Sequence, residues 1–227
     1  MPGRYFIVTP PESARNTLFP EGFNPAPVAA AFESPRYNIA PSQTAPILRV
    51  IEGELVVSDM RWGFAPRWMK DPNKAQINAR SETLFEKPMF KQAATKQRCL
   101  VPTSGWYEWQ PSEDGKKPWA LHREGYEPFA IAGLWTVGNN KEGGPEENFL
   151  TLTTEPSAQV KPIHHRMPVI LDAEGCRIWL DPGSTQDQLT ALLIPWRGSL
   201  TMHRISTVVN SPKHHGPECL EEVKAWR

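Results

Sequence analysis

Alternating hydrophobic and polar positions dominate this chain and predict short strands. Val56, Ser58 and Met60 would face one side of an extended segment, with Val57 and Asp59 on the other, as in a half-buried strand. The same period, or a short apolar run of high β propensity, recurs along the chain. We therefore predict strands at residues 4–9, 45–51, 54–61, 98–102, 119–122, 129–134, 149–153 and 200–205, with another through residues 106–109.

Helical segments are few and short by the same criteria. Ser81 can cap a helix that carries Glu82 in its first turn, and Pro88 interrupts that helix because proline lacks a backbone N–H. Prolines and glycines elsewhere favour shaped loops. We predict helices at residues 11–19, 81–97 with the break at Pro88, 184–193 and 217–225, and loops at 20–35 and 139–148.

The stretch from Thr103 to Trp109 places one acid among three large aromatic residues. Alternation puts Trp106 and Glu108 on one face of a strand, and Tyr107 and Trp109 on the other. A carboxylate against aromatic surface loses water, so its pKa should rise toward neutrality, where it can exchange protons. The alternative is a glutamate at a strand end whose carboxylate stays in solvent.

Composition leaves the number of domains and the type of partner open. The 227 residues can form one large domain or two small ones, and the 24 Pro and 15 Gly favour many short elements. Net charge is zero, so no overall field attracts nucleic acid. Residues 1–100 nevertheless carry 13 Lys and Arg against 9 Asp and Glu. That excess fits either a phosphate-binding face or ordinary solvated surface.

Cysteine spacing argues against a metal or redox motif. Cys99, Cys176 and Cys219 are far apart, and no Cys-x-x-Cys pair occurs. Unpaired cysteines favour a reducing compartment, and neither a secretory signal nor an apolar run of about 18 residues is present. We therefore expect a cytoplasmic protein with no cofactor, no metal and no membrane contact.

Two segments combine arginine with aromatic or amide groups. Residues 61–68 hold two Trp, one Phe and two Arg around a Gly and a Pro that exclude a regular helix. Such a loop can stack on unpaired bases beside phosphates, or it can fill the core with its rings. Asn78 and Arg80 precede the predicted helix start, where an amide and a guanidinium can meet an anion.

Histidines give a weaker signal. His164 and His165 precede Arg166 near the end of a predicted loop. Alone, this pattern indicates proton transfer only weakly, because most histidines outside a motif are structural.

Six motifs occur in order along the chain, namely Arg-Tyr-Asn-Ile-Ala-Pro, Trp-Gly-Phe-Ala-Pro-x-Trp, Asn-Ala-Arg-Ser-Glu, Arg-Cys-Leu-Val-Pro, Gly-Trp-Tyr-Glu-Trp and His-x-Arg-Met-Pro. Each motif alone is weak, but six in one order are specific. Together they resemble the SOS-response-associated peptidase (SRAP) family over nearly the full length of the chain. The resemblance implies a single compact α+β domain over residues 1–227, with curved, mainly antiparallel, barrel-like sheets and a few short helices.

The resemblance also implies a function in the DNA damage (SOS) response. The family holds single-stranded DNA in a positively charged groove and reacts with abasic sites, where the deoxyribose opens to an aldehyde. The family's second residue is a cysteine that becomes the amino terminus. Its amine condenses with the aldehyde, and its thiol closes a stable thiazolidine. The expected partner is single-stranded DNA containing abasic sites, bound by a monomer that is nucleoid-associated when DNA-bound.

The family motifs assign roles to individual residues of this chain. Asn78 matches the asparagine that positions the terminal residue and the sugar, and Glu108 matches the acid that moves protons at the opened sugar. His164 matches the histidine that assists ring opening and Schiff-base proton transfer. Phosphate binding by the two arginines and stacking by the two tryptophans are expected among the DNA contacts, which are Gly3, Arg4, Asn38, Pro41, Trp68, Arg80 and Trp106.

The chain departs from the family at the reacting residue, because Pro2 stands where the family has its cysteine. A thiazolidine needs an amine and a thiol on one terminal residue, so the stable crosslink is not expected. After removal of Met1, Pro2 would carry a secondary amine with a pKa of roughly 8. Such an amine can form an iminium with an aldehyde. We therefore predict a reversible iminium at Pro2, with lyase activity favoured over permanent crosslinking.

Two other functions stay open. The first is a single-stranded DNA-binding module that performs no covalent step. The second is a peptidase, as the family's older name implies. Cysteine-protease chemistry needs a thiolate paired with a base, and the sequence shows no such pairing for its three cysteines.

Overall fold

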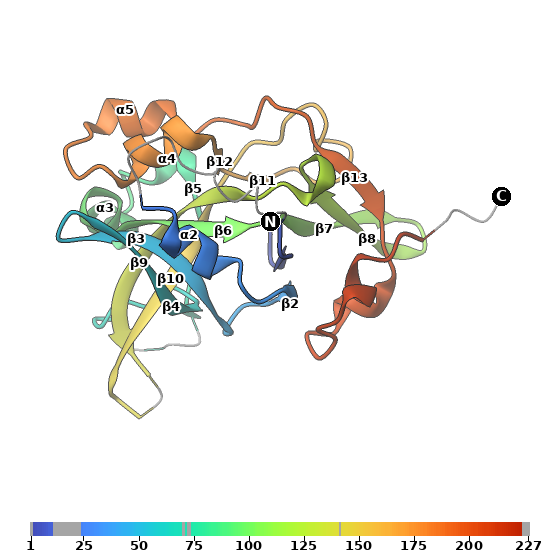
Figure 1. Cartoon of the computed structure of the whole chain (residues 1–227), viewed down its shortest axis with the longest axis horizontal. Coiled ribbons are helices and arrows are strands. Elements are labelled where there is room, and N and C mark those ends of the chain that lie inside the picture. Colours follow the sequence, from blue (N-terminus) through green and yellow to red (C-terminus); the bar gives the residue numbers. More distant parts are fainter. Residues whose placement is uncertain (1, 11–23, 70, 72–73, 141, 224–227) are drawn as a thin grey trace.

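The computed structural model describes residues 2–10, 24–69, 71, 74–140 and 142–223, and consists mainly of strands joined by short loops (Figure 1). The helices are α2 (Ala26–Ala31), α3 (Pro88–Lys96), α4 (Ala173–Leu180) and α5 (Gln186–Ala191), with 3₁₀ turns η2 (Ser81–Thr83), η3 (Glu124–Tyr126), η4 (Thr207–Asn210) and η5 (Pro217–Leu220). The strands are β1 (Tyr5–Ile7), β2 (Arg36–Ile39), β3 (Thr44–Ile51), β4 (Glu54–Trp62), β5 (Asn78–Arg80), β6 (Arg98–Thr103), β7 (Gly105–Ser112), β8 (Gly115–His122), β9 (Phe129–Asn139), β10 (Pro145–Thr154), β11 (Met167–Pro168), β12 (Ile170–Leu171) and β13 (Thr201–Arg204).

Five of the strands close into a barrel. β10 pairs with β4, β4 with β3, β3 with β6 and β6 with β9, and β9 returns to β10. Only the β4–β10 pairing in this circuit is parallel. Closure leaves these strands without a free edge. The α+β domain with mainly antiparallel, barrel-like sheets is therefore confirmed.

The β3–β4 hairpin turns at Glu52-Gly53, in the gap between the strands predicted at 45–51 and 54–61. The two residues have φ angles of 52° and 86°, the left-handed conformation that a tight hairpin turn requires. β4 carries the predicted alternation of less and more exposed positions, whereas three consecutive residues of β3, 47–49, are buried.

A second sheet, in the order β13-β8-β7-β1-β2, begins where β6 passes into β7. Gly105 lies at this passage, where a Cβ atom would approach the Phe6 ring to 2.2 Å and the Leu121 carbonyl oxygen to 2.6 Å. Only glycine fits there. Trp106 then enters the main apolar core, while Tyr107 enters the smaller core on the opposite face. The predicted alternation of β7 is confirmed.

Arg98 joins two helices to β6. Its buried guanidinium donates hydrogen bonds to the carbonyl oxygens of Ala94 and Thr95 near the end of α3, and to those of Trp179 and Asp181 at the end of α4. Carbonyl groups at helix ends lack partners within the helix. One cation therefore satisfies both helix ends and anchors them to the barrel.

Several predicted elements differ from the observed ones. The loop predicted at 20–35 contains α2, and α4 was not predicted at all. The predicted helix at 217–225 is wrong, because the chain forms only η5 and then becomes extended at Glu221. Half of 139–148 is strand, since β9 and β10 extend into it from either side. The helix predicted at 11–19 lies outside the described residues.

Two further predictions hold in outline. The helix near 184–193 is α5, and the segment 81–97 is divided into η2 and α3, with Pro88 opening the second piece as predicted. Within the part of the chain that the structure describes, no helix is long and apolar enough to cross a membrane.

Candidate active site

The beginning of the chain lies against β7. β1 pairs with β7, and the backbone N–H of Tyr107 donates to the carbonyl oxygen of Arg4 at 3.0 Å. Continuing this antiparallel register sets Gly3 opposite Glu108. Pro2 is buried. Pro2 therefore lies in the interior, next to the strand that carries the acid.

The side chain of Asn78 holds the backbone of Pro2. β5 runs parallel to β10, and the register pairs Asn78 with Thr151, whose hydroxyl donates a hydrogen bond to Asn78 Oδ1. That bond orients the amide so that Nδ2 donates to the carbonyl oxygen of Pro2 at 2.7 Å. Sequence analysis missed Thr151, because only the register between β5 and β10 shows which residue of a uniform β segment meets Asn78.

Glu108 is almost completely buried, with 1% of its surface exposed. It lies on the same face of β7 as the fully buried Trp106. Burial raises the pKa of Glu108 from 4.5 to about 8, because the charged form loses its water. The predicted elevation is confirmed, and the solvent-exposed alternative is wrong. At neutral pH the carboxyl group keeps its proton.

His164 faces Glu108, with 3.8 Å between Nε2 of the ring and Oε2 of the carboxyl group. Burial lowers the pKa of His164 from 6.5 to about 4. Between pH 4 and 8 the ring and the acid are therefore both neutral, and the short distance does not represent an ion pair.

A backbone contact favours one tautomer of His164. The N–H of Arg166 donates to Nδ1 at 3.0 Å, an arrangement in which Nδ1 carries a lone pair and the neutral ring holds its proton on Nε2, the atom that faces Glu108. The carbonyl oxygen of Arg166 lies 3.1 Å from the same Nδ1 and accepts a hydrogen bond from the ring only when Nδ1 carries a proton.

Comparison with known proteins places this chain in a sequence family. The profile of the SOS response associated peptidase (SRAP) family matches residues 1–212. This chain belongs to the SRAP family. It is 39% identical over 194 residues to the abasic site processing protein YoqW of Bacillus subtilis (strain 168), covering 82% of this chain and 86% of that protein. It is 32% identical over 224 residues to the abasic site processing protein HMCES of Gallus gallus, covering 84% and 67% respectively.

Solved structures support the SRAP fold. A protein of Bacteroides thetaiotaomicron superposes with a TM-score of 0.77 at 23% identity, over 97% of this chain and 99% of the other. A phage-related protein of Bordetella bronchiseptica gives a TM-score of 0.69 at 25% identity, over 89% and 93%. The barrel and the second sheet are therefore shared beyond close sequence similarity.

Three of the residues expected at the DNA of an SRAP protein are accessible. Trp68 is 64% exposed. Arg80 is exposed at the end of β5 and forms no salt bridge within the described residues. Pro41 is half-buried beside a turn in which Ser42 has a φ of 72°. These positions can meet a ligand without rearrangement of the core.

Arg4 and Asn38 instead fasten the C-terminal segment. The Arg4 guanidinium donates to Asn38 Oδ1 and to the Val209 carbonyl oxygen, both at 2.8 Å, and to the Asn210 carbonyl oxygen at 3.2 Å. The Asn38 amide, 3% exposed, donates to three carbonyl oxygens within residues 209–214. In this structure both side chains therefore bind the C-terminal segment, and their expected contacts with DNA stay predictions.

Trp106 also differs from its expected role. The side chain is 0% exposed and packs edge-to-face against Phe129, with ring centroids 6.1 Å apart. A base needs an exposed aromatic face for stacking. Trp106 cannot provide one in this structure, and its role here is to fill the core beside the strand of Glu108.

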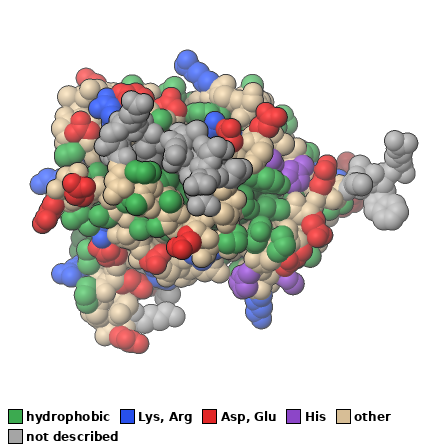
Figure 2. Space-filling model, viewed as in Figure 1, with side chains coloured by type: hydrophobic (Ala, Val, Ile, Leu, Met, Phe, Trp, Pro, Cys, Tyr) green, Lys and Arg blue, Asp and Glu red, His purple; other side chains and the backbone are tan. Residues whose placement is uncertain are grey.

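The surface of this SRAP protein carries no single field of charge on the face seen in Figure 2. Lys and Arg lie among Asp and Glu there, in keeping with the net charge of zero. Local groups rather than a global potential must therefore attract a charged partner. Close to the site, the exposed ring of His165 stacks on His164 with centroids 4.3 Å apart.

Proposed function

We propose that this protein processes abasic sites in single-stranded DNA, and that its amino-terminal residue reacts with the opened sugar. The hydrogen bond from Asn78 to the Pro2 carbonyl oxygen carries the proposal, because it holds the chain start beside the strand of Glu108. The curated relatives support the substrate, since YoqW and HMCES are named abasic site processing proteins.

The reaction requires removal of Met1, which converts the Pro2 nitrogen from a tertiary amide to a secondary amine. The amine attacks C1′ of the aldehyde and forms a carbinolamine, which loses water to give an iminium. The positive nitrogen acidifies C2′. Loss of a C2′ proton then breaks the bond between C3′ and oxygen, and the 3′ phosphate leaves. Water hydrolyses the remaining iminium and regenerates Pro2. Pro2 has no thiol, so no thiazolidine can form.

Glu108 and His164 supply the proton transfers in this scheme. With a pKa of about 8, Glu108 is protonated at neutral pH and can donate to the carbinolamine oxygen as it leaves as water. The resulting carboxylate can then accept the C2′ proton, which restores the starting state. His164 can donate a hydrogen bond from Nε2 to the sugar oxygen that opens.

The peptidase alternative gains no support from the cysteines. Cys99, Cys176 and Cys219 are all buried, and burial raises the pKa of each thiol. None of them supplies a thiolate at neutral pH, as a cysteine nucleophile must. The non-covalent binding module would use the same exposed Trp68 and Arg80, so it has to be separated by experiment.

Borohydride trapping on abasic single-stranded DNA tests the proposal. Protein whose intact mass shows loss of Met1 should form a covalent complex with the DNA when the iminium is reduced. A sample that retains Met1 is the matched control and should not be trapped. The Pro2→Cys variant restores the family residue and should crosslink without borohydride. Processed protein that binds the DNA but cannot be trapped would leave only the binding module.

A further inference from the structure

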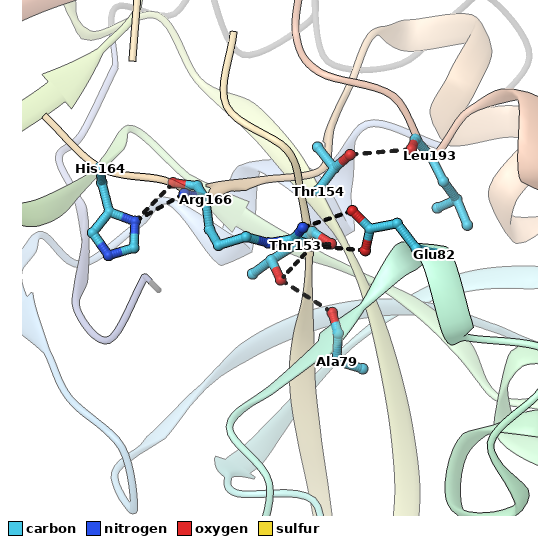
Figure 3. A network of polar contacts seen from close by, with 7 residues as sticks. All are labelled: Ala79, Glu82, Thr153, Thr154, His164, Arg166 and Leu193. Carbon is cyan, nitrogen blue, oxygen red and sulfur yellow. Dashed lines mark hydrogen bonds and ion pairs between the residues drawn. The ribbon is translucent and has the colours of Figure 1, made fainter. Parts of the chain in front are cut away.

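An ion pair joins the loop of His164 to η2; its arginine is buried, whereas the side chain of Glu82 is 41% exposed. Arg166 is only 8% exposed and extends from the loop of His164 to Glu82 on η2 (Figure 3). Its Nη1 donates to Oε1 of Glu82 at 2.6 Å and its Nη2 to Oε2 at 2.9 Å, and Nη2 also donates to the Thr153 carbonyl oxygen at 2.7 Å. Two parallel charge-assisted bonds fix the guanidinium in one orientation.

The side chain and the backbone of Arg166 act on different partners. Its guanidinium is held by Glu82 and Thr153, while its backbone N–H donates to Nδ1 of His164. Only one residue separates Arg166 from His164 along the chain. A shift of the guanidinium would therefore move the N–H that selects the tautomer of the ring.

Strands β5 and β10 position both the Asn78 amide and the loop that carries the His164 imidazole. Thr151 of β10 orients Asn78, and Thr153 of β10 accepts from Arg166 and donates to the Ala79 carbonyl oxygen at 3.3 Å. Glu82 follows β5 by two residues. The ion pair thus ties the loop of His164 to the strand pair that carries Asn78.

We propose that Glu82 is a positioning residue, which acts through Arg166 to hold His164 as the Nε2–H tautomer facing Glu108. The consequence for the reaction rests on the proposed function, whereas the state of the ring does not. The hydrogen bonds from Arg166 keep the pKa of Glu82 below its usual value, so the ion pair persists into the acidic range.

The test compares Glu82→Gln with Glu174→Gln in the full chain. The Glu174–Arg177 pair on α4 is also bidentate, and among the described residues it shares no hydrogen bond with Glu82, Arg166 or His164, so it is the matched control. Nitrogen–proton spectra of the imidazole rings report the tautomer of His164. The wild type and Glu174→Gln should show Nε2–H alone, and Glu82→Gln should show both tautomers. Arg166→Lys, which keeps the charge but loses the fork, should do the same.

Kinetics supply the second measurement. Iminium trapping by Glu82→Gln should be about tenfold slower than in the wild type, with affinity for single-stranded DNA within twofold. An unchanged tautomer in Glu82→Gln overturns the proposal, even where the trapping rate falls. If the tautomer changes in Glu82→Gln but the wild type is never trapped by borohydride, the positioning role of Glu82 is supported. The iminium chemistry of the proposed function is then refuted.

Discussion

Replacing Glu108 by glutamine tests the electrostatics of the site without any DNA. Glutamine has nearly the shape of a protonated glutamate but cannot ionise. In the folded protein the pKa of Glu108 is about 8, against an ordinary value of 4.5. Between these values the unfolded chain has released the proton and the folded protein has kept it. The unfolded state therefore binds fewer protons, and the free energy of unfolding falls as pH rises.

The size of this effect follows from the shift in pKa. Each unit corresponds to about 1.4 kcal/mol, so the raised pKa of Glu108 predicts a loss of stability of about 5 kcal/mol between pH 4.5 and pH 8. Relaxation of the site around the charge would reduce this value, which is an upper limit. Glu108→Gln should lack the loss entirely. Titration of His164 contributes to both proteins and largely cancels in their difference.

The assay is denaturant unfolding of the wild type and Glu108→Gln at intervals from pH 4 to pH 9.5. The variant should gain stability over the wild type as pH rises, by up to about 1.4 kcal/mol per unit, and the gain should level off above the pKa of about 8. The same variant should lose iminium trapping at every pH. If the difference in stability between the wild type and Glu108→Gln stays constant across this pH range, Glu108 titrates as an ordinary surface acid. That result would also refute its role in proton transfer.

Four further substitutions separate reaction, binding and folding. Asn78→Ala removes the bond to the Pro2 carbonyl oxygen and should slow borohydride trapping at least about tenfold, with DNA affinity retained; equal rates would mean that Asn78 does not position the chain start. Trp68→Ala should weaken single-stranded DNA binding by about 1–3 kcal/mol, measured by fluorescence anisotropy, with no change in the unfolding midpoint, because the Trp68 ring is 64% exposed. Trp106→Ala should lower the free energy of unfolding by about 3–5 kcal/mol, because the Trp106 ring is fully buried. Arg98→Met leaves four helix-end carbonyl oxygens without their donor and should cost about 3 kcal/mol or more in denaturant unfolding, and a neutral result would contradict the joining role.

Local patterns were enough to predict nine of the thirteen strands that the structure describes, though not β2, β5, β11 and β12, and one chemical property. The β3–β4 hairpin follows from alternation around Glu52-Gly53, and both signals are contained in neighbouring residues. The raised pKa of Glu108 was predicted in the same way, from the aromatic residues near it in sequence, and burial of the acid produces the shift. α4 escaped prediction because its buried face is completed by the barrel and not by its own eight residues.

The environment of a side chain was harder to predict than its strand. Motif matching assigned Arg4 and Asn38 to DNA, but their partners lie some 170 or more positions away in the C-terminal segment. Thr151 and Glu82 are equally invisible in sequence, because their importance depends on the register of β5 on β10 and on the loop of Arg166. Contacts between distant segments are set by tertiary packing, which no local pattern encodes.

The burial of Trp106 and the raised pKa of Glu108 both result from the close packing of one face of β7. Gly105 allows Phe6 to approach β7 closely, and the following tryptophan fills the core completely. Packing of that quality admits no water to the adjacent positions of the same face, so the Glu108 carboxylate is destabilised and the neutral acid is favoured. A smaller residue in place of Trp106 would open the core and admit water to Glu108, which would lower the pKa of that acid. Trp106 therefore influences proton transfer through packing, even though it offers no surface to a base.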